Sequence, residues 1–432
     1  MAVSVKVGAF DVSTAAAGNT QAITGVGFLP KFILFWWSGI VSSVDAISGG
    51  NHQRGFGAAI SATERRSTSS QSQDASASAV SDHGQELDEC IFTITTAGGI
   101  DGLMDLQSMD SDGFTLIIDD QFAGAVRIHY MAFGGSDLTN YVLGHFSMPQ
   151  ALGNADVITG LSFRPDFVLF FGGKRNVDVD SISPDSQNML GFAVSSTKQG
   201  CWTGGSNNAS TTMQTMSYCF DGECFATMNT GVVALTDRFS FVQFNADGVK
   251  VNVLDFSADV NRVHYLAVKG GLWTVGDLLT QVDTVTDIVE SGFGFSPRCA
   301  FFVSHGKAKS TQNTPTDHDR YSCGAFSSLT DRGSHGILDQ DAVADSVVTR
   351  AVEHDELYVN ISTAEAIDGL MDIKSIDSDG FTCIMDDADP SQAFVTYFAV
   401  GDSPPSAGQP TMRRWIHVPG MQSVLPRLGR AG

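Results

Sequence analysis

The spacing of apolar residues along the chain predicts β-strands. Residues 32–37 (FILFWW) form a continuous apolar run that begins two residues after Pro30, as a strand buried on both faces would. Residues 90–95 and 239–244 alternate between apolar and polar side chains, which is the period of a half-buried strand. Residues 57–62 are small and leave room for close packing against a neighbour. Because no ten-residue stretch follows the 3.6-residue period of a helix, we expect an all-β protein built from antiparallel β-sandwiches.

The pattern occurs three times along the chain. Three landmarks recur at spacings of 135 and then 132 residues: the proline of a Gly-x-x-Phe-x-Pro motif (Pro30, Pro165, Pro297), an Asp-Gly pair (Asp112, Asp247, Asp379) and a tyrosine (Tyr130, Tyr265, Tyr397). Such internal repetition is the signature of a repeat architecture. We therefore expect three tandem homologous antiparallel β-sandwich domains, residues 1–136, 137–271 and 272–402, followed by an extended arm, residues 403–432.

The three repeats are not equally similar. Residues 100–105 and 367–372 share the sequence Ile-Asp-Gly-Leu-Met-Asp, which the second repeat lacks, so the second repeat has either lost a site or gained a different neighbour. Two polar segments interrupt the strands of each repeat, residues 38–54 and 61–84 in the first. We expect them to be loops, which is where recognition usually lies on a rigid scaffold.

Composition narrows the class of protein. The formal net charge of −23 argues against nucleic acid as a partner, because binding phosphates needs a basic surface. No stretch approaches the ~18 uncharged apolar residues of a membrane span, and the start of the chain lacks the basic segment and apolar run of a secretory signal. Seven cysteines without a disulfide framework predict reduced thiols in a chain made in the cytoplasm.

The segment 403–432 differs from the rest of the chain. It holds five of the twelve prolines, four arginines and no acidic residue, so it is expected to be extended, yet several of its side chains are too apolar for a solvated linker. We expect an arm that docks on an acidic partner or on a neighbouring copy of the chain, with Trp415 as its anchor. The residues expected to dock are Arg413, Arg414, Trp415, Ile416, Met421, Arg427 and Arg430. The alternatives are a frayed end or a strap folded back on the acidic body.

Candidate catalytic and metal-ligating residues are few. Three aspartates (Asp105, Asp110 and Asp112), repeated as Asp372, Asp377 and Asp379, include part of a calcium loop but lack its distal glutamate, and the capping of turns is the simpler explanation. The histidines lack metal-ligand spacing, and Asp317, His318 and Ser322 are too close in sequence to form a triad together. Cys219 and Cys224 have neither redox nor zinc spacing. The sequence therefore predicts no enzyme, no cofactor and no metal site.

One group of residues has the composition of a sugar-binding platform. Aromatic faces stack on sugar rings, while amide and guanidinium groups bond the hydroxyls. The possible glycan contacts are Trp37, Asn51, His52, Gln53 and Arg54. The alternative is that Trp36 is a core residue and Trp37 lies at a contact between domains.

Three motifs together resemble a β-sandwich domain of tailed bacteriophages. They are Gly27-Phe28-Leu29-Pro30 near the start of a repeat, Ser111-Asp112-Gly113-Phe114 late in it, and Tyr130-Met131-Ala132-Phe133 at its end. The resemblance covers residues 1–402. It implies a virion structural protein, from head decoration or tail, which is made in the host cytoplasm and has no enzymatic activity.

Two functions follow from this resemblance. In the first, three related domains in one chain imitate a trimer at a site of threefold or quasi-threefold symmetry, and the arm binds other virion proteins or copies of the same chain. In the second, the protein is a receptor-binding tail or fibre protein whose polar loops hold host glycans. A secreted array of carbohydrate-binding modules is a third possibility, against which the lack of a secretory signal counts. Neither nucleic acid nor a membrane is an expected partner.

Overall fold

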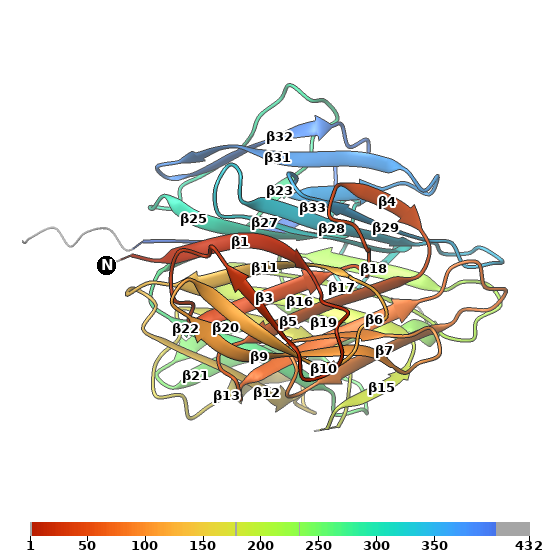
Figure 1. Ribbon diagram of the computed structural model, residues 1–432, viewed down its shortest axis with the longest axis horizontal. Coiled ribbons are helices and arrows are strands. Elements are labelled where there is room, and N and C mark those ends of the chain that lie inside the picture. The colour runs from red at the N-terminus through yellow and green to blue at the C-terminus, as the bar shows by residue number, and fades with distance from the viewer. Residues whose placement is uncertain (1, 178, 233, 403–432) are drawn as a thin grey trace, which may run out of the picture.

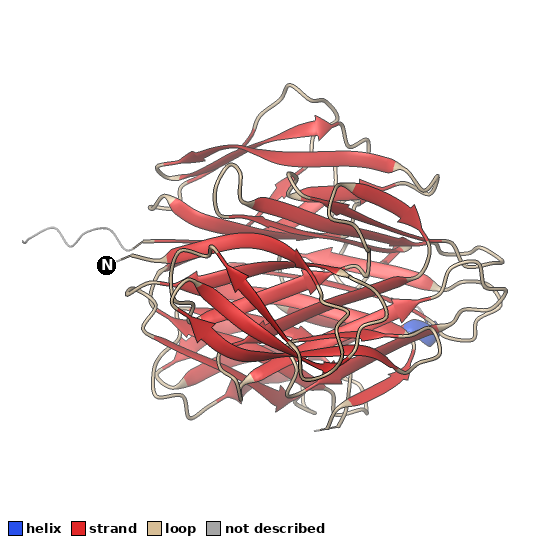
Figure 2. Cartoon of the chain, viewed as in Figure 1, coloured by secondary structure: helices blue, strands red, loops and turns tan. Residues whose placement is uncertain are grey.

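The computed structural model of the chain describes residues 2–177, 179–232 and 234–402. Within these ranges the only helix is η1 (Thr230–Val232), a single 3-10 turn, and all other regular structure is β-strand (Figures 1 and 2). The all-β prediction is therefore confirmed. The predicted arm, residues 403–432, lies outside the described residues.

Each repeat forms one large and one small antiparallel sheet, in the same strand order. The first repeat has β1 (Ser4–Asp11), β11 (Arg127–Gly134), β3 (Phe32–Trp37), β5 (His52–Ala59), β6 (Arg65–Ser72) and β7 (Ser81–Glu86) in the large sheet, and β2 (Thr20–Thr24), β10 (Gly113–Asp120), β9 (Ile100–Asp110) and β8 (Ile91–Ile94) in the small one. The second repeat has β12 (Asn140–Ser147), β22 (Arg262–Lys269), β14 (Phe167–Gly172), β16 (Ser186–Ser195), β17 (Lys198–Ser206) and β18 (Thr215–Phe220), with β13 (Gly153–Ile158), β21 (Gly248–Asp255), β20 (Ala234–Asn245) and β19 (Phe225–Asn229). The third repeat has β23 (Leu272–Leu279), β33 (Phe394–Gly401), β25 (Pro297–Ser304), β27 (Asp319–Phe326), β28 (Arg332–Asp339) and β29 (Val348–Glu353), with β24 (Ile288–Ser291), β32 (Gly380–Asp387), β31 (Ile367–Asp377) and β30 (Tyr358–Ile361).

The strands at the centre of each large sheet are buried on both faces. In β3, Leu34 and Trp36 belong to a hydrophobic core that all three repeats share. Phe35 and Trp37, on the opposite face of the same strand, pack in a separate core between the two sheets of the first repeat. Because neither face meets water, the strand reads as a continuous apolar run without polar alternation.

The shared core joins the three repeats through aromatic contacts. The ring centroid of Phe56, in β5, lies 5.3 Å from that of Phe171 in the second repeat and 6.0 Å from that of Phe301 in the third. An aromatic pair of this kind contributes about 0.5–1.5 kcal/mol beyond the area that it buries. The three repeats therefore share one continuous hydrophobic core.

The repeats also exchange strands. The polar segment that follows the first apolar strand leaves its own sheet and pairs with the edge of another large sheet. β15 (Ser181–Pro184) of the second repeat pairs with β7, β26 (Thr316–Asp317) of the third with β18, and β4 (Ala46–Gly49) of the first with β29. The three donations close a ring, and each covers an edge strand that would otherwise be exposed. The segment 38–54 thus contains strand β4 and the start of β5, where a loop was expected.

The expectation of a loop along all of residues 61–84 is wrong, because half of this segment belongs to β6 and β7. Ser69, Ser70 and Gln71 are fully buried in β6. The side chains of β6 are polar on both faces of the strand, so its sequence lacks the apolar alternation that predicts a strand. The segment is extended because it pairs with β5 on one side and with β7 on the other.

Two close approaches explain recurring residues. A Cβ atom on Gly57 would lie 1.9 Å from the carbonyl oxygen of Cys90, which confirms that this strand is small because a neighbour packs on it. The recurring tyrosine lies over a glycine in the adjacent strand: a Cβ atom on Gly8 would lie 2.5 Å from the Tyr130 hydroxyl, and Gly144 faces Tyr265 in the same way. The aromatic ring fills the space that the glycine leaves open.

Candidate functional site at the junctions of the repeats

Three hairpin loops meet at the end of the molecule away from the N-terminus. We call residues 73–80, 207–214 and 340–347 the tip loops; they join β6 to β7, β17 to β18 and β28 to β29. Strand registers place them far from the start of β1, because Ser4 pairs with Gly134 whereas the tip loops follow the opposite ends of the sheets. In Figure 1 the N-terminus is on the left and these loops are on the right.

Backbone hydrogen bonds connect the tip loops in a ring. Two bonds join each pair of loops: Ala75 N–H to Ser346 O (2.8 Å) with Ser346 N–H to Ser76 O (2.9 Å), Ala209 N–H to Ala79 O (2.8 Å) with Ala79 N–H to Ser210 O (2.8 Å), and Ala342 N–H to Met213 O (2.9 Å) with Met213 N–H to Val343 O (2.9 Å). Ala75, Ala209 and Ala342 occupy the same position in each loop and have φ angles of 53°, 57° and 59°. An L-residue in this region is strained, so the repetition of the conformation shows that the ring imposes it.

Side chains reinforce the ring in the same cyclic order. Asp74 Oδ1 accepts a hydrogen bond from the N–H of Val348 in the third repeat (2.8 Å). Asn208 Oδ1 accepts one from Ser81 N–H (3.0 Å) in the first repeat, and Asp341 Oδ1 accepts one from Thr215 N–H (2.9 Å) in the second. The tip is therefore a scaffold of backbone contacts and of hydrogen bonds to two carboxylates and one carboxamide.

A buried ion pair lies inside this ring. Both terminal nitrogens of Arg54, in β5, donate to the carboxylate of Asp319, in β27, over 2.9 Å each. The guanidinium carbon lies 4.9 Å from the ring centre of Trp202 in the second repeat. The side chains of Arg54 and Asp319 are 1 % and 0 % exposed. One interaction thus connects all three repeats in a region without water contact.

A second carboxyl group shares this interior. Asp339 is buried, and burial together with the charge of Asp319 raises the pKa of its carboxyl to about 7. It lies at the end of β28, at the position that Ser72 and Ser206 occupy in the other two repeats. Asp339 is therefore partly protonated near neutral pH and can donate a hydrogen bond.

Two buried histidines connect the first and third repeats. His335 Nδ1 lies 2.9 Å from Ser38 Oγ, and its Nε2 lies 2.9 Å from His129 Nδ1. The ring of His129 stacks on Trp36 at a centroid distance of 5.7 Å. Burial lowers the pKa of His335 to about 3 and that of His129 well below its usual value. Both rings are neutral at pH 7 and act as packing and hydrogen-bonding groups between the repeats.

The prediction of an exposed sugar-binding platform is wrong. Trp37, His52 and Arg54 are buried, at no more than 1 % exposure. Asn51 Oδ1 accepts a hydrogen bond from Asp74 N–H in the tip scaffold (2.9 Å), and Gln53 Nε2 donates to Ile94 O (2.9 Å). Asn51 thus supports the ring of tip loops, whereas Gln53 contacts the small sheet of its own repeat.

Of the two adjacent tryptophans, Trp36 is a core residue, as the alternative predicted, whereas Trp37 does not lie at a contact between repeats. Trp36 makes the contact between repeats, at 5.4 Å from the ring centroid of Phe301. Trp37 packs in the core of its own repeat, where a Cβ atom on Gly55 would lie 2.0 Å from its ring. A shift of one residue along a strand exchanges its two faces, and the composition of FILFWW cannot fix which face meets the neighbour.

The recurring aspartates cap turns. Asp112 accepts hydrogen bonds from the N–H groups of Gly25 (3.2 Å) and Gly27 (2.7 Å). Asp379 does the same for Gly292 (3.1 Å) and Gly294 (2.5 Å). Asp105, in contrast, receives both a 3.0 Å and a 2.6 Å hydrogen bond from Arg65. Asp110 accepts hydrogen bonds from the hydroxyls of Ser108 (2.9 Å) and Thr115 (2.7 Å). The three aspartates of the first repeat thus have separate partners, and the prediction of turn capping holds for Asp112 but not for Asp105.

The other candidates for chemistry have structural contacts. His318 Nδ1 accepts a hydrogen bond from Asp341 N–H (2.8 Å), and Ser322 Oγ accepts one from Val359 N–H (3.0 Å), so neither is directed at the other. All seven cysteines are buried and free, in agreement with the prediction of reduced thiols. Burial raises the pKa of each thiol, which makes them poor nucleophiles.

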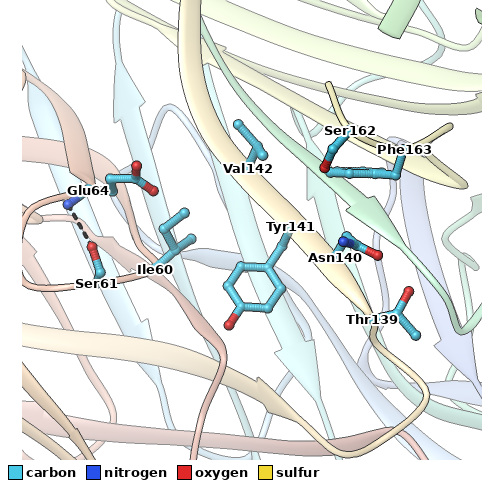
Figure 3. A pocket seen from close by; sticks show the side chains of 9 residues that line it. All are labelled: Ile60, Ser61, Glu64, Thr139, Asn140, Tyr141, Val142, Ser162 and Phe163. Atoms are coloured by element: carbon cyan, nitrogen blue, oxygen red, sulfur yellow. Dashed lines mark hydrogen bonds between the residues drawn. The ribbon is translucent and has the colours of Figure 1, made fainter. Parts of the chain in front are cut away.

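The end of the molecule that carries the N-terminus is hollowed between repeats. Figure 3 shows a hollow of about 430 Å³ where Tyr141 of the second repeat lies beside Ile60 of the first. A related hollow of about 520 Å³ lies between the second and third repeats and is lined by Trp273, which is the counterpart of Tyr141. Val3 N–H donates to Asp402 Oδ1 (2.6 Å), so the start and the end of the described chain meet at this same end.

Neither a protein-family model nor a curated protein sequence matches this chain. Among the described residues, no helix has the length and apolar character needed to cross a membrane. The docking residues predicted for the arm, from Arg413 to Arg430, lie outside the described residues.

Sequence reasoning did not find the ring of tip loops or the ion pair inside it. A signal for the ring was present: the tip loops carry Asp74-Ala75, Asn208-Ala209 and Asp341-Ala342 at equivalent positions. A repeated Asx-Ala pair in a polar loop indicates a fixed turn. For the ion pair no signal exists, because Arg54, Trp202 and Asp319 have no counterpart of the same type in the other repeats.

Proposed function

We propose that this protein is a structural component of a tailed-phage virion, either a head decoration or a tail-associated protein. The repeats 1–136, 137–271 and 272–402 act as three sandwich domains in one rigid body. The C-terminal arm, residues 403–432, holds the body to other virion proteins or to copies of the same chain. The protein has no enzymatic activity in this proposal, and it is located on the virion after synthesis in the host cytoplasm.

The observation that carries the proposal is that the three repeats form a closed ring. The first and last described residues lie together on one side of this ring. Strand exchange and the side-chain contacts of the tip loops follow the same cyclic order, and all three repeats contribute to one core. Such a body has the shape of a trimer, which suits a threefold or quasi-threefold position on a particle. Because Asp402 lies beside Val3, an arm that follows it begins at the end opposite the tip loops. The resemblance to phage β-sandwich domains supports the same function.

Truncation tests the role of the arm. We expect the chain 1–402 to fail to join particles, with a melting temperature nearly unchanged, because the truncated chain keeps every described residue of the shared core, from Val3 to Val400. A matched variant, Trp415→Ala with Arg413→Ala and Arg414→Ala in the full chain, should give the same assembly defect. A large loss of stability on truncation would instead identify the arm as a strap on the body.

The position on the virion can be found by gold labelling of purified particles with antibodies against residues 1–402. Label over the heads would identify a decoration protein, and label along the tail would identify a tail-associated protein. Absence of label from intact and from detergent-opened particles would refute the virion proposal and favour a secreted module.

The alternative function is a receptor-binding tail or fibre protein. The observation that favours it is the placement of the polar tip loops at the end away from Asp402, where a particle-bound body would present them outward. Label confined to the tail tip, together with binding of the chain 1–402 to a host glycan, would support it. The residues to test are then exposed ones of the tip loops such as Thr211 and Asp345, since Trp37, His52 and Arg54 are buried.

A further inference from the structure

Four carboxylate groups converge where the second repeat donates its strand to the first. Glu86, Asp88 and Glu89 lie in the turn after β7, and Asp180 immediately precedes β15. One carboxylate oxygen from each of the four lies within 4.8 Å of those of the other three. Glu86 and Glu89 are only 5 % and 7 % exposed, whereas Asp88 and Asp180 are open to solvent.

These carboxylates lack a compensating cation. None of the ion pairs between described residues includes any of the four. Glu89 Oε2 is buried without a hydrogen-bond partner. The nearby Arg65 already donates two hydrogen bonds to Asp105. Burial, together with the neighbouring carboxylates, raises the pKa of Glu86 to about 8 and that of Glu89 to about 9.

The second repeat shows what this position needs. The turns of the three repeats align, so that Glu89 corresponds to Glu223 and Glu356. In the second repeat, Arg238 of β20 donates two hydrogen bonds to the carboxylate of Glu223. The counterpart of Arg238 in the first repeat is Leu103, because Cys90 and Cys224 donate to Met104 O and Phe239 O in the same register. In the second repeat the buried glutamate thus pairs with an arginine. In the first repeat this arginine is missing, and three further carboxylates lie beside the buried glutamate.

We propose that Glu86, Asp88, Glu89 and Asp180 bind one calcium ion, which fastens the exchanged strand of the second repeat to the first repeat. Calcium takes six to eight oxygen ligands at about 2.3–2.6 Å, so no two of its ligand atoms are more than about 5 Å apart, and these oxygens meet that limit. Magnesium usually keeps several waters and binds through one or two carboxylates, so four converging carboxylates favour calcium. Water completes the coordination on the side of Asp88 and Asp180, which is open to solvent. The proposal does not depend on the virion function.

The junction between the first and third repeats provides a matched comparison. Asp45 there accepts a hydrogen bond from His354 N–H (2.7 Å), just as Asp180 accepts one from Leu87 N–H (2.7 Å). The group at this junction, Asp45 with Glu353 and Asp355, has one carboxylate fewer. Glu356, the counterpart of Glu89, also has a buried Oε2 without a hydrogen-bond partner, but it is not a member of this converging group. We therefore assign the calcium site to the first junction alone.

Calorimetric titration of the full chain with CaCl₂, after treatment with EDTA, tests the proposal. We expect one calcium ion per chain with a dissociation constant between about 10⁻⁶ and 10⁻³ M, and a rise in melting temperature on saturation. Asp180→Asn should weaken binding at least tenfold, and the matched variant Asp45→Asn should bind as the unchanged chain does. Melting curves in EDTA at pH 5.5 verify that each variant is folded.

A second variant separates loss of the site from loss of the fold. Leu103→Arg supplies Glu89 with the partner that Arg238 gives Glu223, so this variant should be stable in EDTA and should no longer respond to calcium. The proposal is wrong if 10 mM CaCl₂ produces neither heat nor a change in melting temperature (a limit roughly tenfold above the weakest calcium sites of proteins). It is also wrong if calcium binds but Asp180→Asn binds it equally well.

Discussion

The ion pair inside the ring of tip loops makes a quantitative prediction. Replacing Arg54 by methionine keeps a side chain of similar length but leaves Asp319 as a buried charge without a partner. The two hydrogen bonds of 2.9 Å and the contact with Trp202 are lost together, in a place where both side chains are at most 1 % exposed. Removing one member of such a buried pair costs about 3–5 kcal/mol.

This cost converts into a measurable shift in melting temperature. If the three repeats unfold together, about 400 residues at roughly 2.1 cal/mol/K each give an unfolding entropy of about 0.85 kcal/mol/K. A loss of 3–5 kcal/mol then lowers the melting temperature by about 4–6 °C. Calorimetry gives this value directly, and tryptophan fluorescence during unfolding in urea reports on Trp202 beside the pair.

A double-mutant cycle isolates the interaction itself. Arg54→Met and Asp319→Asn together remove both charges, so the double variant should be more stable than the sum of the two losses predicts, with a coupling energy of about 2–3 kcal/mol. Lys374→Met, at an exposed ion pair with Asp287, is the control and should change stability by less than about 0.5 kcal/mol. The reasoning fails if Arg54→Met behaves like this control, or if the cycle gives no coupling.

Three further predictions use other parts of the molecule. A thiol reagent should modify none of the seven cysteines of the native chain in the first minutes, and all seven in guanidinium, since all are buried; fast reaction of one thiol would show an opening of the fold. Gly144→Val should destabilise the chain by about 1–3 kcal/mol in urea unfolding, because its Cβ atom would lie 2.7 Å from the Tyr265 ring, whereas Gly153→Ala, which has open space around it, should cost only what its positive φ imposes. In EDTA, stability should fall as pH rises from 7 to 9, because Glu86 and Glu89, with pKa values of about 8 and about 9, keep protons in the folded chain that the unfolded chain loses near 4.5. Calcium should reduce this fall without removing it, because Glu356, outside the site, has a raised pKa of about 9 as well; a pH dependence that calcium leaves unchanged would contradict the assignment of the site.

Local sequence patterns predicted the parts of the fold that depend on one strand at a time. The apolar run at β3, the small residues of β5 and the Asp-Gly turn after β9 each have a local cause, which is burial on both faces, close approach of a neighbour and capping by Asp112. The repeat spacing followed from landmarks that fill the same role in each copy, such as Tyr130 over Gly8.

The candidate site depends on contacts between repeats, and these leave little trace in a single sequence. β6 is polar because it lies inside a ring of three sheets, so it lacks the apolar period by which strands are recognised. Arg54 was expected at a surface because arginine is seldom buried, and only the approach of Asp319 from another repeat makes its burial possible. Trp37 was assigned to the wrong face because FILFWW is apolar at every position.

Joining three repeats in one chain explains why equivalent positions carry different residues. Registers of β5, β16 and β27 align Arg54, Asn188 and Tyr321, and these three side chains line the same enclosed space. A trimer of identical chains would place three copies of one residue there, and three arginines would bury like charges that no single carboxylate could neutralise. In the single chain, Asn188 Nδ2 donates to Arg54 O (3.3 Å), and the Tyr321 ring faces the guanidinium. The same freedom accounts for Arg238, which neutralises Glu223 in the second repeat, while its counterparts Leu103 and Leu370 leave the first and third repeats with clustered carboxylates.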